Sequence, residues 1–411
     1  MGISKDTEIF TLENGIRVVH LPRRNSSICY LGLMIEAGSR DELEGETGLA
    51  HFIEHSLFKG TRKRKTYHIL NRLDSVGGEV NAYTSKEDTV IHTSFLKEHA
   101  ERALELVADI AFSSSFPVKE LKKEKEVIID EINSYLENPS EIIFDDFDEM
   151  IYEDHPLGRP ILGDIETVRS FEREDIYKFQ HRRYHPELMV LSFYGDIPSK
   201  KLLKWASKYF SGYTNSSPVH TRIQVPEYEK KELWKKQDGK QAHAIIGNRA
   251  YSVEEDKKLP FLVLNNLLGG PAMNTLLNLN IREKHGIAYN LESHFQSFSD
   301  TGLFQIYIGT DQGQLNKGIR LIMKQLQNCR DKRLGTRQLH NAKEQLKGHI
   351  ALSNDGGTNV MLALAKSMIL YDKIESIESI LERINEINSS DILEVANEIM
   401  GEKELSTLIY V

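Results

Sequence analysis

The sequence predicts an α+β protein built from two similar domains. The chain has 411 residues, more than one ordinary hydrophobic core accommodates. A small, polar segment with a proline, residues 211–221, lies near the midpoint, and the charged run 227–236 follows it. Strand-like and helix-like patterns occur in the same order on both sides of this linker. We therefore expect two homologous domains, residues 1–215 and 216–411, each with a mixed or antiparallel sheet packed against helices.

The first half predicts a strand, two helices, two strands and a helix, in that order. An apolar run with β character begins the series, and two adjacent glycines end the second helix. Period-2 patterns then indicate two strands, and a period near 3.6 indicates a long amphipathic helix. The expected ranges are 27–37 for the first strand, 48–58 and 67–75 for the helices, 79–85 and 89–95 for the next strands, and 99–112 for the last helix.

The second half repeats this series. Gly286 corresponds to the glycine break of the first half, and the other elements match within a few residues. Two unrelated α+β halves with a chance similarity are the alternative to a duplication. The expected ranges are 241–248 for the first strand, 260–268 and 274–285 for the helices, 287–295 and 302–310 for the next strands, and 315–329 for the last helix.

Composition and charge exclude several classes of function. The formal net charge is −9, whereas a protein whose main partner is nucleic acid needs a basic face. Cys29 and Cys329 are too few and too far apart for a disulfide framework or a thiolate metal site. No run approaches the roughly 20 apolar residues of a membrane helix, and the N-terminus lacks the pattern of a signal peptide or presequence. We expect a soluble, cytoplasmic protein with no nucleic-acid or membrane partner.

The segment 51–55 carries the clearest chemical signal. Residues four apart on a helix project from one face, so His51 and His55 can present imidazole nitrogens to one ion about 2 Å away, the distance that zinc prefers. Glu54 borders the same face without having to ligate, which is where a general base for a metal-bound water belongs. Two histidines alone are as consistent with ordinary surface or core residues, and the intervening glutamate favours the metal site.

A second histidine pair with the same spacing serves as an internal comparison. Pro186 directly follows the pair His181 and His185, no acid lies between the two histidines, and two arginines there would repel a cation. We interpret this pair as the end of a helix rather than as a metal site.

A third zinc ligand must come from another part of the chain, because catalytic zinc usually has three protein ligands and one open position. Residues 122–132 have the pattern of an amphipathic helix, on which Glu124 and Glu131 lie two turns apart on one face. Glu131 is the candidate ligand, and Glu124 is a candidate partner for a histidine N–H. Most such carboxylates are solvated helix edges, which is our interpretation of Glu126 and Asp130.

These residues meet a known pattern. His-x-x-Glu-His, followed by a glutamate 76 positions after the second histidine, resembles the inverted zinc motif of the pitrilysin family of metallopeptidases, in its mitochondrial-processing-peptidase-like branch. Ser56, His285 and the segment 273–277, which lacks an arginine, depart from the family pattern, but none of them is a proposed metal ligand. Further segments resemble family landmarks, in the same order over nearly the whole chain: 38–40, 58–61, 77–84, 155–163, 194–197 and 281–289.

The resemblance implies a zinc endopeptidase with one zinc ion per chain. His51, His55 and Glu131 would hold the ion, and a water would take the fourth position. Glu54 would remove a proton from that water as it attacks a peptide carbonyl. Glu124 would hold a ligating histidine in place.

The resemblance also implies residues that bind the peptide substrate. Asn81 and Ala82 would pair with the peptide backbone as an added strand, and Arg282 and Tyr289 would contact peptide carbonyls from the second half. A surface ion pair for Arg282 and a core position for Tyr289 are the alternatives. In this family two units of this size close like a clamshell around a chamber. Because this chain has both the metal motif and the Arg–Tyr pair, we expect a homodimer.

Two other functions stay open. The family contains chains that have lost the metal motif and serve as non-catalytic structural or assembly subunits, and a metal-dependent hydrolase of another bond type would use the same zinc chemistry. The glycine-rich segment 268–271 lacks the lysine and the spacing of a phosphate loop, and the acidic run 141–149 lacks the spacing of a calcium-binding EF-hand. We interpret these two segments as a helix break and a solvated helix face.

Overall fold

The computed structural model describes residues 6–217, 219, 221–237 and 241–411. By their contacts the residues form two units, each of which combines segments that are distant in the sequence. The boundary predicted near residue 215 lies close to the change of unit after Arg222, but the segments 135–158 and 352–377 each belong to the unit of the other half. The first unit comprises Met1–Ser134, Arg159–Arg222 and Leu352–Ile377, and the second comprises Tyr135–Gly158, Ile223–Ala351 and Glu378–Val411.

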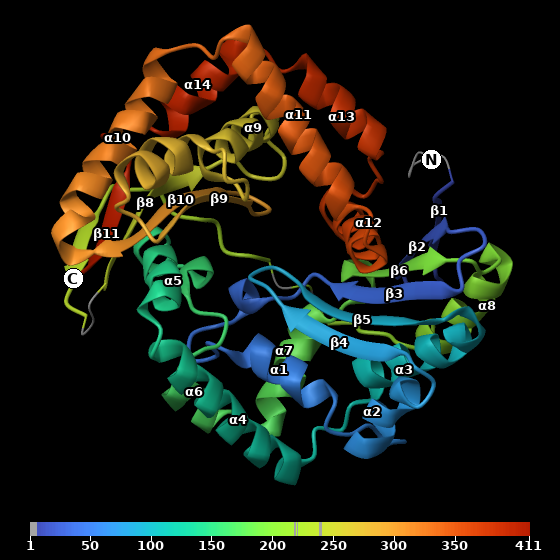
Figure 1. Ribbon diagram of the computed structural model, residues 1–411. Helices are drawn as coiled ribbons and strands as arrows, with labels where there is room; N and C mark the ends of the chain where they lie inside the picture. Colours follow the sequence, from blue (N-terminus) through green and yellow to red (C-terminus); the bar gives the residue numbers. More distant parts are fainter. Residues whose placement is uncertain (1–5, 218, 220, 238–240) are drawn as a thin grey trace. The chain divides into compact units, whose positions relative to one another are not determined.

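The first unit is built on a six-stranded mixed sheet. In spatial order its strands are β1 (Glu8–Thr11), β2 (Arg17–Pro22), β6 (Met189–Gly195), β3 (Ile28–Ile35), β5 (Thr89–Leu96) and β4 (Glu79–Thr84) (Figure 1). Neighbouring strands are antiparallel, except for β2 and β6, which are parallel. β4 is thus an edge strand of this sheet.

Both faces of the first sheet are buried, because side chains alternate along its strands. On β3, Leu31 and Leu33 belong to the larger core, whereas Met34 belongs to a smaller core on the other face. The larger core is covered by α1 (Leu49–Leu57), α2 (Thr66–Asp74), α3 (Ala100–Ser113), α4 (Val118–Leu136), α6 (Ile165–Ser170), α7 (Arg173–Arg183) and α8 (Ser199–Phe210), and the smaller core by α12 (Gly357–Tyr371).

The second unit has a five-stranded mixed sheet. In spatial order its strands are β7 (Glu232–Lys235), β11 (Ser406–Tyr410), β8 (Gln241–Ala250), β10 (Gly302–Asp311) and β9 (Asn290–Ser297). Its larger core contains side chains of α9 (Lys258–Gly269), α10 (Leu315–Asp331), α11 (Thr336–Ser353), α13 (Ile377–Glu386) and α14 (Ser389–Ile399), and its smaller core contains those of α5 (Pro139–Ile151). In the described part of the chain, no helix combines the length and the apolar composition that crossing a membrane requires.

The two sheets repeat one topology. The order β2-β6-β3-β5-β4 corresponds to β7-β11-β8-β10-β9, and in both sheets the first pair of this series is parallel and the others are antiparallel. The predicted fold, two similar α+β domains, is confirmed. The elements predicted for the first half agree with the structure within two residues at each end. In the second half, the helix expected at 274–285 contains a π-helix at Asn278–Glu283.

Two helices are exchanged between the halves of the sequence (Figure 1). α5 belongs to the first half, yet its Phe147 packs with Ile245 of β8 in the second unit. α12 belongs to the second half, yet its Leu364 packs against the first sheet. A Cβ atom on Gly32 of β3 would lie 2.3 Å from the sulfur of Met361, so a larger residue there would displace the end of the Met361 side chain of α12.

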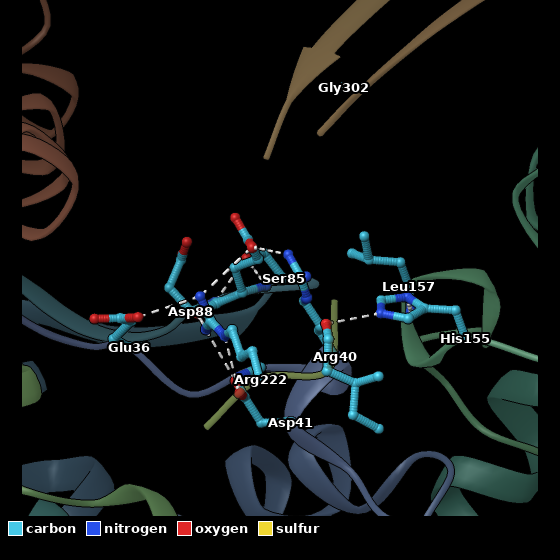
Figure 2. Close-up of polar contacts among 12 residues, drawn as sticks. Glu36, Arg40, Asp41, Ser85, Asp88, His155, Leu157, Arg222 and Gly302 are labelled. Atoms are coloured by element: carbon cyan, nitrogen blue, oxygen red, sulfur yellow. Dashed lines mark hydrogen bonds and ion pairs between the residues drawn. The ribbon is translucent and has the colours of Figure 1, made fainter. Parts of the chain in front are cut away.

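Arg222 fixes the segment that follows α8 to the first unit. Its guanidinium donates to the two carboxylate oxygens of Asp41 at 2.9 and 3.0 Å and lies 3.2 Å from Glu36 (Figure 2). Burial lowers the pKa of Arg222, but Asp41, Glu87 and Glu36 together raise it above its ordinary value. This network also holds the buried turn Ser39–Asp41, which directly precedes the residues that lead into α1.

Candidate metal centre

Helix α1 places both histidines of the motif at the border of the larger core. Phe52 and Ile53 are fully buried and anchor the helix. His51 is 8% exposed, whereas Glu54 and His55 are half-buried. The ring centroids of His51 and His55 are 4.5 Å apart, as expected for neighbours on one helix face.

Glu131 on α4 brings a carboxylate to the two histidines. Its Oε2 lies 4.0 Å from Nε2 of His51 and 3.7 Å from Nε2 of His55. The three ligand atoms all lie within 4.8 Å of one another, and no other group of three or more His, Cys, Asp or Glu residues in the described chain is arranged in this way. The pair His181 and His185 and the acidic run 141–149 accordingly form no such group.

Glu124 holds His55 from the side opposite to Glu131. Its Oε1 lies 3.0 Å from Nδ1 of His55, and its Oε2 lies 2.7 Å from Nζ of Lys59. When Nδ1 donates its proton to this carboxylate, the lone pair of the neutral ring is on Nε2, the nitrogen nearer Glu131. His51 has no equivalent support, because its buried Nδ1 lacks a hydrogen-bond partner among the described residues.

The electrostatic environments of these groups differ. Burial, together with the neighbouring His55, lowers the pKa of His51 to about 4. Burial also acts to lower the pKa of His55, but the hydrogen bond with Glu124 and the charges of Glu54, Glu124 and Glu131 raise it above its ordinary value. Glu124 shows the converse effect: burial raises its pKa, and its contacts with His55 and Lys59 lower it overall.

Glu54 lies beside the candidate metal ligands and beside the edge strand β4. Burial raises the pKa of Glu54, with a further contribution from the charge of Glu131, while Thr84 at the end of β4 and His55 oppose this rise. A carboxylate with a raised pKa is a stronger base than one in water. General base catalysis is most efficient when the pKa of the base lies near the pH of the reaction. The position of Glu54 therefore suits a general base.

The donor set fits zinc. Two imidazole nitrogens and one carboxylate oxygen are a ligand set that catalytic zinc uses, with a fourth position for water or substrate. Bonds of about 2 Å place the ligands of a tetrahedral zinc site roughly 3.3 Å apart. The separations of 4.0 and 3.7 Å from Glu131 to the histidines are therefore close to those of a metal site.

Asn81 and Ala82 lie on β4, for which the family resemblance implies a substrate-binding role. They pair with His92 and Ile91 of β5, and no strand in the described part of the chain pairs with the other side of β4. The amide of Ala82 donates to the side-chain oxygen of Asn81 at 3.1 Å. This side of β4 is therefore available to a further strand.

Arg282 and Tyr289 lie in the second unit, before β9. Arg282 is exposed within the π-helix and forms no ion pair among the described residues, which argues against the alternative of a surface ion pair. Tyr289 is 55% exposed, so it is no core aromatic, and its hydroxyl donates to Asp311 at 3.1 Å. Both side chains are accessible to a ligand.

Sequence reasoning missed two residues around the centre. Lys59 pairs with Glu124, and its only signal was its place in the segment 58–61, which follows the motif. Glu42 accepts hydrogen bonds from the start of α1, and no local pattern distinguishes it from the neighbouring acids of that loop.

Comparison with known families matches both halves of the chain. The family described as insulinase, peptidase family M16, matches residues 17–165, and the one described as the peptidase M16 inactive domain matches residues 170–346. An uncharacterized zinc protease of Bacillus subtilis is 34% identical over 97% of this chain and 97% of its own length. The mitochondrial-processing peptidase subunit beta of Saccharomyces cerevisiae is 29% identical over 97% of this chain and 90% of its own length.

Two solved structures share the fold. A protease from Helicobacter pylori has a TM-score of 0.88 at 21% identity, covering 98% of this chain and 99% of its own. A peptidase M16 inactive domain from Pseudomonas fluorescens has a TM-score of 0.91 at 18% identity, covering 98% of each chain. At these identities the likeness establishes the fold alone.

Proposed function

The chain belongs to the M16 family of peptidases, and from this premise we propose that it is a zinc-dependent endopeptidase acting on short or unfolded peptides. The convergence of His51, His55 and Glu131 carries the proposal. Relatives named zinc proteases support zinc as the metal. We propose one zinc ion per chain, because the described residues contain a single group of this kind.

Glu54 is the general base of the proposed reaction. When bound at the three ligands, zinc supplies Lewis-acid polarisation of a water and of the peptide carbonyl. Glu54 accepts a proton from the attacking water and then donates it to the leaving amine. Its raised pKa supports both steps, because the side chain must hold the proton between them. Glu124 keeps Nε2 of His55 directed towards the ion.

The unpaired side of β4 is the proposed binding site for the peptide backbone. A peptide in extended conformation would add to the sheet as a further strand along Asn81 and Ala82. The amide of Ala82 would then exchange its bond to the Asn81 side chain for one to a substrate carbonyl. Because Glu54 lies next to Thr84 at the end of this strand, a peptide bound there passes close to the proposed base.

Arg282 and Tyr289 of the second unit are proposed to contact the carbonyls of the peptide substrate. The exposure of both side chains supports this role.

Two copies of the chain are proposed to form the working enzyme. Light scattering at micromolar concentration is expected to give twice the monomer mass of 47.1 kDa. A single monomer peak would contradict the homodimer.

Cleavage of an unstructured peptide tests the proposed activity. We expect cleavage that a chelator abolishes and zinc restores. The variant Glu54→Gln keeps the metal ligands and is expected to lower kcat about 100- to 10,000-fold, the usual contribution of a general base, with zinc affinity unchanged. A variant that binds zinc and cleaves at the wild-type rate would remove Glu54 from this role.

A non-catalytic subunit is the second candidate. One relative is named as a subunit of a processing peptidase, and the match over residues 170–346 is to a domain described as inactive. This candidate predicts that the purified chain binds zinc without cleaving any member of an unstructured peptide library. Mapping the cleavage sites in that library by mass spectrometry separates the two candidates and, if cleavage occurs, reports the sequence preference.

A further inference from the structure

Helix α1 begins without an ordinary N-cap. Residues with a short polar side chain usually precede a helix and accept hydrogen bonds from its first free amides. Here the preceding residue is Gly48, whose φ is +91° and which offers no side-chain acceptor. A Cβ atom at this position would lie 2.7 Å from Cα of Gly163 and 2.8 Å from the carbonyl oxygen of Leu162. A serine, threonine or aspartate therefore cannot take the capping position.

Glu42 supplies the missing acceptors from six residues upstream. Its Oε2 accepts from the amide of Gly48 at 3.0 Å, and its Oε1 accepts from the amide of Ala50 at 2.8 Å. The amide of Leu49 donates to the carbonyl of Glu46 at 2.9 Å. Both oxygens of one side chain are thus committed to the first turn of the helix that carries the histidines.

Burial of the Glu42 carboxylate costs folding free energy, so stabilisation of the fold alone does not explain this residue. The side chain is 2% exposed, and its carboxylate forms no ion pair with any described residue. Burial raises the pKa of Glu42 well above its usual range, although the two amides oppose this effect. The desolvation penalty of this carboxylate is only partly offset by the two hydrogen bonds and by the charge of Arg159. What it provides is a fixed position for the start of α1.

Buried carboxylates hold α1 at both ends. Glu42 binds the N-terminal amides, and Glu124 binds the ring of His55 in the last turn. Glu42 is itself held in place, because the adjacent Asp41 is bound by Arg222 (Figure 2). A slide or rotation of the helix along its axis breaks the contacts at one end or the other.

We infer that Glu42 is a positioning residue of the metal centre, which sets the axial position and the rotation of α1 so that His51 and His55 meet Glu131. The inference rests on the proposed zinc function. Ligand sets tolerate errors of only about 0.5 Å in position, and Glu42 acts directly on the turn that contains His51.

The variant Glu42→Gln tests this role in the full-length protein. An amide keeps the volume but directs an NH2 group at one of the two backbone amides, so one hydrogen bond is lost. We expect zinc affinity, measured by competition with a chromogenic chelator, to fall about 10- to 100-fold, as for other residues that support metal ligands. In the metal-free protein, hydrogen exchange of residues 49–57 is expected to accelerate. Glu42→Asp, which keeps the charge but shortens the reach, is expected to give an intermediate loss.

Asp109→Asn is the matched control. Asp109 is a buried carboxylate of the same unit, 4% exposed, and it accepts hydrogen bonds from Thr61 and Arg64 rather than from α1. Its replacement is expected to lower the melting temperature and to leave zinc affinity and exchange in residues 49–57 unchanged. If the control weakens zinc binding as much as Glu42→Gln does, the effect is general destabilisation and the inference is wrong.

Two further outcomes separate this inference from the proposed function. If both Glu42 variants had the zinc affinity and the hydrogen-exchange rates of the wild-type protein, the positioning role would be overturned. This conclusion would hold whether or not the protein cleaves peptides. Zinc binding without peptide cleavage in the wild-type protein would overturn the proposed peptidase activity, and the comparison of affinities and exchange rates would still decide the role of Glu42.

Discussion

His51 and His55 share one helix face, but proton binding affects them differently. With its pKa lowered to about 4, His51 is neutral throughout the physiological range. The carboxylates around His55, Glu124 above all, raise its pKa, so His55 keeps its proton to higher pH. Because zinc binds only the neutral imidazole, pH acts on the centre through His55.

NMR titration of the metal-free protein tests this difference. We expect the His51 ring to titrate near pH 4 and the His55 ring above the value of a free histidine. Below the His55 midpoint, zinc must displace one proton, so apparent zinc affinity should rise about tenfold per pH unit and level off above it. Coincident midpoints for the two rings, or an affinity independent of pH, would contradict this account.

Part of the site could be predicted from local spacing. The separation of His51 and His55 and the acid between them predict a shared helix face, because helical geometry alone decides it. The contact with Glu131 depends on how two helices pack, so its assignment came from the resemblance to a known family. Glu42 was missed for the same reason: its acceptors reach α1 through a loop whose conformation the sequence pattern does not report.

Helix α4 presents carboxylates to two different environments. Glu124 is 5% exposed and bound to His55 and Lys59, whereas Glu126, two residues later, is exposed. The amphipathic pattern of residues 122–132 predicts the helix, and residues two apart on a helix point in different directions. The two glutamates therefore form a matched pair for mutation.

The variant Glu124→Gln should weaken zinc binding, and Glu126→Gln should not. An amide in place of the Glu124 carboxylate removes the charge that orients His55, for which a loss of about 10- to 100-fold in zinc affinity is typical. The pKa of His55 in the metal-free protein should also fall, because the main contribution that raises it is lost. Chelator competition and NMR titration measure the two effects. Equal affinities of the two variants would show that the contact does not support the ligand.

Part of the elements could be predicted from the sequence, and one difference from the prediction is informative. For the six elements predicted in the first half, the expected ends lie within two residues of the observed ones, whereas β1, β2, β6 and α8 were not predicted. Over 274–285 the same reasoning predicted a helix without indicating its type, and the structure has a π-helix at Asn278–Glu283. Apolar periodicity reports which face is buried and does not distinguish α from π hydrogen bonding, and π-helical turns are frequent at functional sites. Arg282 lies within this segment.

At the scale of the molecule, the exchange of α5 and α12 could not be predicted from the sequence. Both helices are amphipathic and follow a long helix, so their patterns predict a buried face without indicating which sheet receives it. The exchange is reciprocal because the two sheets share one topology. Each half of the sequence contributes a helix to the sheet of the other half at the equivalent place in that topology. A boundary drawn at one point of the chain, such as residue 215, describes neither unit completely.

Truncation of the exchanged helices should act on the sheet of the other half. Phe147→Ala in α5 is expected to cost about 3–5 kcal/mol of unfolding free energy and to accelerate hydrogen exchange in β8 and β11 rather than in β3. The reciprocal variant Leu364→Ala in α12 should accelerate exchange in β3 and β6. Exchange measured by mass spectrometry resolves the two sheets. If hydrogen exchange accelerated only in the sheet of the same half of the sequence, the observed packing of α5 and α12 would be contradicted.

Because of these exchanged helices, the two sheets receive their covering helix at different times during synthesis of the chain. About 160 residues separate the end of β6 from the start of α12, so at about 5–20 residues per second a ribosome needs roughly 10 to 30 seconds to deliver the missing cover. During that interval Met34 and Val190 of the nascent first sheet remain open to solvent. The second sheet has no such delay, because α5 leaves the ribosome before its strands. A chaperone that recognises apolar surface thus has a defined period in which to bind the half that contains the candidate metal site.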